Sequence, residues 1–233
     1  MKAWHCSAVP AVQTTTTRKN GTMIHAIMVD VDGVLVNGRP ADGRPWASDI
    51  ETDLGISNVA LNREFFGPYW NDIVVGRHGL AEQLKPVLAR IAPSVPHESL
   101  IAYWFESDAR LNRPLLEALS QLRKTGTKVY LATNQEHLRA AYLMDRLDLA
   151  LHVDGIYYSA ALGSRKPDLD FFKQAAAHSG FAPEQLLLID DTPANVVAAR
   201  QLGWNAVQWM EGCCLSAELA KLQTEGVHLA PSS

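Results

Sequence analysis

The sequence of 233 residues has little that would place the protein in a membrane or on nucleic acid. It contains no apolar run approaching about 18 residues, the length that a membrane-spanning helix needs. Its formal net charge of −4 gives no excess of positive charge with which to bind nucleic acid or anionic lipid. We therefore expect a cytoplasmic protein that binds neither nucleic acid nor a membrane.

Cysteine is also scarce. Cys6, Cys213 and Cys214 form an odd set of three, and the last two are adjacent. This pattern predicts no disulfide framework and lacks the spacing of a cysteine metal site, so we expect structural thiols. The first 22 residues lack apolar periodicity, which predicts a flexible N-terminal tail at 1–22.

What the sequence does contain is alternation of strand and helix patterns. A short buried strand is predicted just before Asp30, and the alternation resumes after residue 112. The later strands are predicted at 127–132, 154–158, 186–190 and 205–208, and the helices at 114–124, 136–147, 168–178 and 193–202. Such alternation predicts an α/β fold with a doubly wound, Rossmann-like parallel sheet. Beyond Ser216 we expect one short helix and then a frayed end.

The middle of the chain follows a different pattern. From Ser48 to about Asn112 the apolar spacing is helical, and the turn residues just before it predict a small β-hairpin. With 47% apolar residues, the chain can fill one substantial core and carry one inserted module. We therefore expect a flap and helical cap at 37–112, inserted into a catalytic core made of 23–36 and 113–233.

Four short polar segments stand in order along the chain, and three of them follow predicted strands. They are Asp30-Val-Asp32-Gly33, Thr133-Asn134, Lys166-Pro167-Asp168 and Asp190-Asp191. Because open parallel sheets bind ligands at the carboxyl edge of their strands, these side chains should share one site. Up to four carboxylates would crowd that edge and repel one another unless a cation is present. An all-oxygen cluster of this kind suits Mg²⁺.

This ordered set of motifs resembles the haloacid dehalogenase-like (HAD) hydrolase superfamily. The resemblance runs from Ile24 to about Val207 and fits the branch with a helical cap after the first motif. Sugar-phosphate phosphatases and the N-terminal phosphatase domains of epoxide hydrolases are the most similar members. The resemblance implies a Mg²⁺-dependent phosphatase that hydrolyses a small phosphorylated metabolite, such as a sugar phosphate, through an aspartyl-phosphate intermediate.

The resemblance also implies a role for each motif residue. Asp30 would be the nucleophile, and Asp32 would protonate the leaving oxygen and later activate water. The Thr133 hydroxyl and the backbone N–H of Asn134 would bind phosphoryl oxygens. Lys166 would neutralise charge between the phosphate and Asp30.

A metal site follows from the same resemblance. Its ligands would be Asp30, the backbone carbonyl of Asp32, and Asp191. Asp190 would contribute through a bound water or from behind the direct ligands. Asn195, one helical turn past Asp191, is either a support for this loop or an ordinary surface residue.

Other interpretations stay open. Phosphomutases share all four motifs, and a catalytically inactive HAD scaffold could act only as a binding module. Each motif taken alone could also be a turn or a helix cap. Asp32 favours phosphate over halide chemistry, because a halide leaving group needs no proton. The aromatic residues of the predicted cap are expected to pack in its interior: Phe65, Phe66, Tyr69, Trp70, Trp104 and Phe105.

Overall fold

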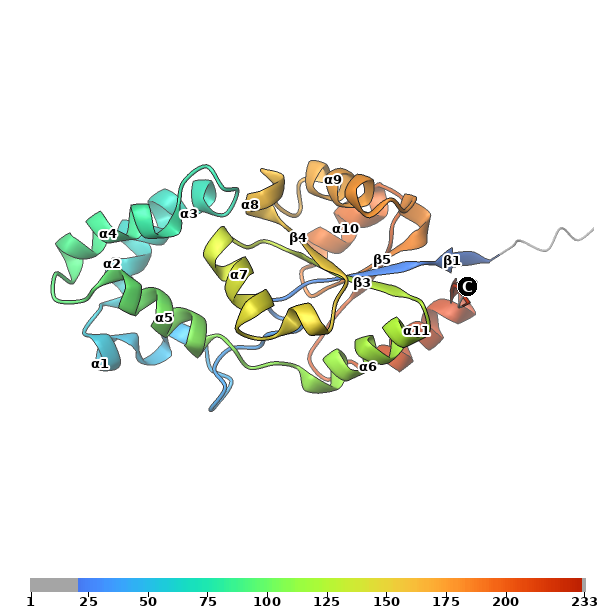
Figure 1. The fold of residues 1–233 in the computed structure, drawn as a ribbon, viewed down its shortest axis with the longest axis horizontal. Helices are drawn as coiled ribbons and strands as arrows, with labels where there is room; N and C mark the ends of the chain where they lie inside the picture. The colour runs from blue at the N-terminus through green and yellow to red at the C-terminus, as the bar shows by residue number, and fades with distance from the viewer. Residues whose placement is uncertain (1–20, 232–233) are drawn as a thin grey trace, which may run out of the picture.

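The centre of the protein is a five-stranded parallel sheet with the strand order β4-β3-β2-β5-β6. The structure is a computed structural model that describes residues 21–231 (Figure 1). The strands are β2 (Ala26–Val29), β3 (Lys128–Thr133), β4 (Gly155–Tyr158), β5 (Leu186–Asp190) and β6 (Asn205–Gln208). Every residue of β2 and β5 is buried, as expected of central strands covered on both faces. The predicted Rossmann-like sheet is confirmed.

Helices cover both faces of this sheet (Figure 1). Because side chains alternate along a strand, Ile27 and Val29 pack in one apolar cluster while Ala26 and Met28 pack in the other. The first cluster lies under α6 (Arg113–Lys124), α7 (His137–Asp145) and α11 (Leu215–Thr224). The second lies under α9 (Leu169–Ser179) and α10 (Pro193–Gln201). Shorter connecting elements are η3 (Leu149–Leu151), α8 (Ser159–Leu162) and η4 (Pro183–Gln185).

A second, two-stranded sheet joins the two ends of the described chain. Strand β1 (Thr22–Ile24) pairs in parallel with β7 (Val227–Leu229). The expectation of a frayed end after Ser216 is therefore wrong. Val227 and Leu229 pack against the main core, which holds this segment in place. Thr22, expected in the flexible tail, already belongs to β1, and residues 1–20 of that expected tail lie outside the described residues.

The inserted helical segment, residues 46–107, forms an apolar cluster of its own, and we call it the cap (Figure 1). Its elements are η1 (Trp46–Asp49), α1 (Ile50–Leu54), α2 (Asn58–Leu61), the π-helix η2 (Asn62–Phe66), α3 (Gly67–Ile73), α4 (Leu80–Ile91) and α5 (His97–Ser107). All six aromatic residues expected inside the cap pack in or against this cluster. Phe65 and Phe105 are buried, and the other four are half-buried.

Two chain segments connect the cap to the sheet, and they run side by side. Val36 pairs with Leu111 in an antiparallel bridge, and the N–H of Asn37 donates to the carbonyl of Arg110 at 3.0 Å. We call residues 33–45 the flap and residues 108–112 the return linker. The β-hairpin expected within the flap does not form as paired strands among the described residues. A turn takes its place, in which the N–H of Gly43 donates to Arg39 O at 2.8 Å and the N–H of Arg39 donates to Arg44 O at 2.9 Å. Pro40 and Pro45 lack the N–H groups that a hairpin ladder would use.

Candidate active site

The carboxyl ends of three neighbouring strands bring the first, second and fourth motifs to one edge of the sheet. Asp30 follows β2 directly, while Thr133 and Asp190 are the last residues of β3 and β5. The strand register places Val29 beside Leu131 and beside Ile189, so the residues after them lie at the same level. The edge predicted to hold the site is thus where these polar side chains meet.

Lys166 links the third motif to this edge. Its ammonium group is buried and lies 2.9 Å from Oδ1 of Asp30 and 2.5 Å from Oδ2 of Asp190. The side chain of Asn134 holds the backbone of Lys166 on both sides: Oδ1 accepts from the lysine N–H at 2.8 Å, and Nδ2 donates to its carbonyl at 2.9 Å. This clamp was not predicted, and a role for the Asn134 N–H toward phosphate stays a prediction.

Asp190 has a partner for each of its oxygens. Oδ1 accepts from the N–H of Thr192 at 2.9 Å and from Nδ2 of Asn195 at 2.9 Å, while Oδ2 faces Lys166. Asn195 is itself buried, so it supports the loop, but it does so through Asp190 and not through Asp191. With Asp190 committed to these contacts, the neighbouring Asp191 is the freer of the two carboxylates.

Asp191 lies half-buried against the backbone of Gly33. A Cβ atom at Gly33 would be 2.2 Å from Oδ2 of Asp191, and Gly33 has a φ of +82°. Glycine is the residue that accommodates both the close approach and the left-handed backbone. Gly33 thereby allows the flap to leave β2 while Asp191 points into the site.

The carboxylates fit a hard divalent cation. Asp30, Asp190 and Asp191 each offer an oxygen, and these oxygens all lie within 4.8 Å of one another. Three converging carboxylates with no nitrogen or sulfur donor are the ligand type that Mg²⁺ prefers. The side chain of Asp32 is outside this group, which leaves it free for another role.

Asp32 is an exposed residue, two positions beyond Asp30. Nε2 of the buried Gln135 donates to Oδ2 of Asp32 at 2.7 Å. The sequence offered one signal for this contact, namely the position of Gln135 directly after Thr133 and Asn134. Residues on this loop were expected to face phosphate, yet Gln135 orients the second aspartate.

The charges in the site perturb one another. Burial raises the pKa of Asp30 to about 7, although the nearby Lys166 opposes the shift. Desolvation by the protein packed around Asp32 also raises the pKa of that carboxyl, and the charge of Arg139 is the strongest influence that lowers it. Burial together with the charge of Asp32 raises the pKa of Asp108, on the return linker, to about 6. A site with this many carboxylates takes up protons unless a cation balances their charge.

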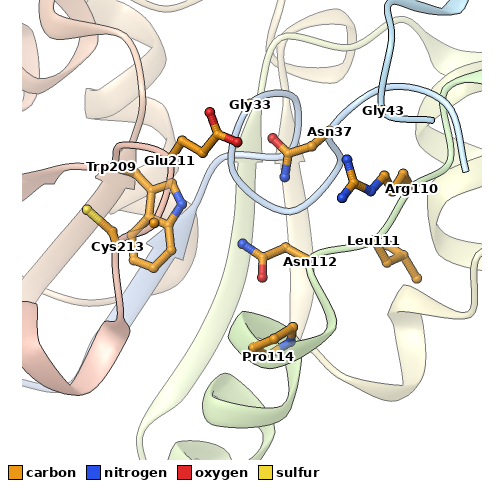
Figure 2. A pocket seen from close by; sticks show the side chains of 11 residues that line it. Gly33, Asn37, Gly43, Arg110, Leu111, Asn112, Pro114, Trp209, Glu211 and Cys213 are labelled. Atoms are coloured by element: carbon orange, nitrogen blue, oxygen red, sulfur yellow. The ribbon is translucent and has the colours of Figure 1, made fainter.

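A polar cavity of about 520 Å³ lies beside Gly33, between the flap, the return linker and the loop after β6 (Figure 2). Asn37, Asn112 and Trp209 approach it from these three segments, and Arg110 and Glu211 complete its charged rim. Since Gly33 also touches Asp191, the cavity adjoins the carboxylate cluster.

The model of the haloacid dehalogenase-like hydrolase family matches residues 24–203. The chain belongs to this family. This HAD-like hydrolase is 28% identical over 213 residues to a sesquiterpene phosphatase of Aspergillus oryzae, a match that covers 86% of this chain and 97% of the relative. It is 26% identical to the drimenol cyclase of Aspergillus calidoustus over 79% of this chain, but it spans only about a third (34%) of that relative.

Solved structures show the same fold. A HAD family enzyme of Bacteroides thetaiotaomicron, solved in complex with magnesium and inorganic phosphate, superposes with a TM-score of 0.70. The two share 19% identity, and the match covers 84% of this chain and 98% of the other. Among the described residues, no helix of this hydrolase is long and apolar enough to cross a membrane.

Proposed function

We propose that this hydrolase is a Mg²⁺-dependent phosphatase that cleaves a small phosphomonoester, such as a sugar phosphate or a similar metabolite, through an aspartyl-phosphate intermediate. The observation that carries the proposal is the buried Lys166 ammonium between Asp30 and Asp190, beside three carboxylates that converge on one point. Buried ionisable groups of both signs in this arrangement are typical of a catalytic site.

Asp30 is the proposed nucleophile. Its Oδ1 accepts from the N–H of Val31 at 2.7 Å and from Lys166, so the carboxylate is held in one orientation. Oδ2 is then the oxygen that forms the bond to phosphorus as the bond to the leaving alkoxide breaks. Lys166 and the Thr133 hydroxyl would stabilise the charge on the transferring phosphoryl oxygens.

Asp32 is the proposed acid and base. It gives a proton to the leaving alkoxide, and the alcohol departs. Asp32 then takes a proton from the water that attacks the aspartyl-phosphate, which releases inorganic phosphate and restores Asp30. Its raised pKa supports this role, because the carboxyl must carry a proton in the first step. The hydrogen bond from Gln135 lowers that pKa, so what it contributes is the orientation of the carboxyl.

Asp30, Asp191 and the Asp32 carbonyl are the proposed direct Mg²⁺ ligands, with Asp190 behind them. Bound Mg²⁺ would neutralise phosphate charge and would remove the repulsion between these carboxylates. The relative named a sesquiterpene phosphatase supports the phosphatase chemistry, and the Bacteroides enzyme with magnesium and phosphate supports the choice of metal.

The experiment is to measure inorganic phosphate released from an aryl phosphate, with Mg²⁺ and with excess EDTA. We expect release in Mg²⁺ and its loss in EDTA. Undiminished release in EDTA would exclude the metal role, and no release from any ester with Mg²⁺ present would exclude the phosphatase. A panel of phosphorylated metabolites would then identify the substrate.

A further inference from the structure

Arg139 is the one buried arginine among the described residues, with 1% of its surface exposed. It is the third residue of α7, the helix whose Leu143 packs in the apolar cluster on one face of the central sheet. An arginine stays charged in a protein, so burying it is costly unless hydrogen bonds and an opposite charge compensate. Its partners therefore indicate what the structure gains from placing it there.

Its hydrogen-bond partners lie at the end of the cap and at the start of the return linker. Nη1 of Arg139 donates to the carbonyl of Phe105 at 3.0 Å, and Nη2 donates to the carbonyl of Asp108. The Asp108 carboxylate lies 3.5 Å from Nη2. The guanidinium also lies 5.3 Å from the ring centre of Phe105 and 5.4 Å from that of Tyr142. One side chain thus contacts both the last turn of α5 and the start of the return linker.

The geometry suits the end of a helix. The last carbonyls of α5 have no partner within the helix, and Phe105 is among them. The partial negative charge at a helix C-terminus also attracts a cation. A planar guanidinium can satisfy two carbonyls and a carboxylate at once, whereas a lysine ammonium lacks the rigid fork this requires.

The backbone of Arg139 is held by Glu136, next to the loop that carries Gln135. The buried carboxylate of Glu136 accepts from the N–H of Leu138 at 2.8 Å and from the N–H of Arg139, which caps the start of α7. Gln135, which donates a hydrogen bond to Asp32, directly precedes Glu136 in the sequence. The positive charge of Arg139 also lowers the pKa of the Asp32 carboxyl, against the larger raising effect of desolvation. Arg139 therefore connects the loop that orients Asp32 with the segment that carries the cap.

We propose that Arg139 is a positioning residue that latches α5 and the return linker onto α7, and so fixes how the cap sits relative to the loop that orients Asp32. The inference rests on the proposed phosphatase function for its catalytic consequence. Its structural part stands on the contacts alone. On the opposite side of the cap, Arg165 contacts Asn71 at 2.8 Å and Ser159 donates to Val74 O at 2.5 Å, so the cap is held from two sides.

The test compares Arg139→Met with Arg146→Met, a matched change at an exposed position on the turn that follows α7. Hydrogen exchange is measured over residues 104–112, together with kcat and KM for an aryl phosphate and for a phosphorylated metabolite. In Arg139→Met we expect exchange in this segment to rise by about tenfold or more, because the latch no longer opposes local opening.

We also expect kcat/KM for the metabolite to fall by about tenfold more than for the aryl phosphate, since only the former depends fully on cap placement. Arg139→Lys, which keeps the charge, should recover part of this loss. A residue that only stabilised the fold would lower the melting temperature and leave the ratio between the two substrates unchanged.

Wild-type exchange and an unchanged substrate ratio in folded Arg139→Met would overturn the latch. If that variant does not fold, the same two readouts on Arg139→Lys decide the question in the same way. Should the wild-type protein release no phosphate from any ester, the proposed phosphatase fails, while the exchange comparison still tests the latch.

Discussion

The carboxyl edge of the sheet and the cap hold their charged side chains in opposite ways. At the sheet edge, Lys166 and Asp190 are buried and lie 2.5 Å apart. In the cap, the side chains of Arg63 and Arg77 are 71% and 70% exposed and pair with residues close to them in the sequence. Exposed pairs contribute little to stability, and a buried pair costs desolvation that it only partly regains. The buried charges are therefore best explained by the proposed reaction, and the exposed ones by solvation of the surface.

After loss of the nucleophile itself, the largest effect on turnover is expected at Asp32. Asp32→Asn should slow the hydrolysis of alkyl phosphates by about 10²–10⁴-fold, the usual contribution of a general acid. Aryl phosphates should lose less, because their leaving groups need less protonation. Rates for a series of esters would show this. Asp72→Asn, the same change on the cap surface, is the control. An equal loss across aryl and alkyl esters would mean that Asp32 is not the acid.

Lys166→Met should reduce both activity and stability. We expect phosphate release to fall by about 10²–10³-fold, because one stabilising group in the transition state is lost. Without metal at neutral pH, the free energy of unfolding should fall by about 3–5 kcal/mol, since the two aspartates lose their shared cation. Urea unfolding would measure this against Lys85→Met, an exposed lysine of α4. Equal stability of the two variants would refute the buried pair as an energetic unit.

The adjacent aspartates should differ in their effects on metal binding. Asp191→Asn should weaken Mg²⁺ binding by more than about tenfold, because a proposed direct ligand loses its charge. Asp190→Asn should weaken it less and should chiefly destabilise the fold, since Asp190 already contacts Lys166 and Asn195. Calorimetric titration with Mg²⁺ would compare them. Equal dissociation constants for the two variants would reverse the assignment.

The smallest effect concerns pH. Because the pKa of Asp30 is raised to about 7, Mg²⁺ must displace a proton from it at lower pH. Below that value we expect Mg²⁺ affinity to fall by up to about tenfold per pH unit. In the metal-free protein the folded state holds this proton and the unfolded state does not, so the contribution of Asp30 to the free energy of unfolding falls as pH rises from 3.8 to about 7. A flat Mg²⁺ affinity across this range would contradict the shift.

The sequence predicted the sheet, and the meeting of the motif residues at one edge of it, because both follow from local patterns. The strands at 186–190 and 205–208 have the predicted bounds, and polar residues at strand ends meet at one edge in any parallel sheet. The clamp from Asn134 and the burial of Arg139 depend on segments about 30 residues away in the chain. No periodicity within one helix or loop can indicate such partners. Strand β7 was missed for the same reason, since its partner β1 lies at the other end of the described chain.

The most direct test of the account is to look for a phosphoryl group on Asp30. Protein mixed with Mg²⁺ and substrate is quenched in acid during turnover, and the peptide that contains Asp30 is analysed by mass spectrometry. We expect a phosphorylated Asp30 in the wild-type protein, and neither the modification nor turnover in a folded Asp30→Asn variant, because an amide is a poor nucleophile. Steady release of phosphate by Asp30→Asn at the wild-type rate, with no phosphoryl group on the wild-type peptide, would contradict the proposed mechanism.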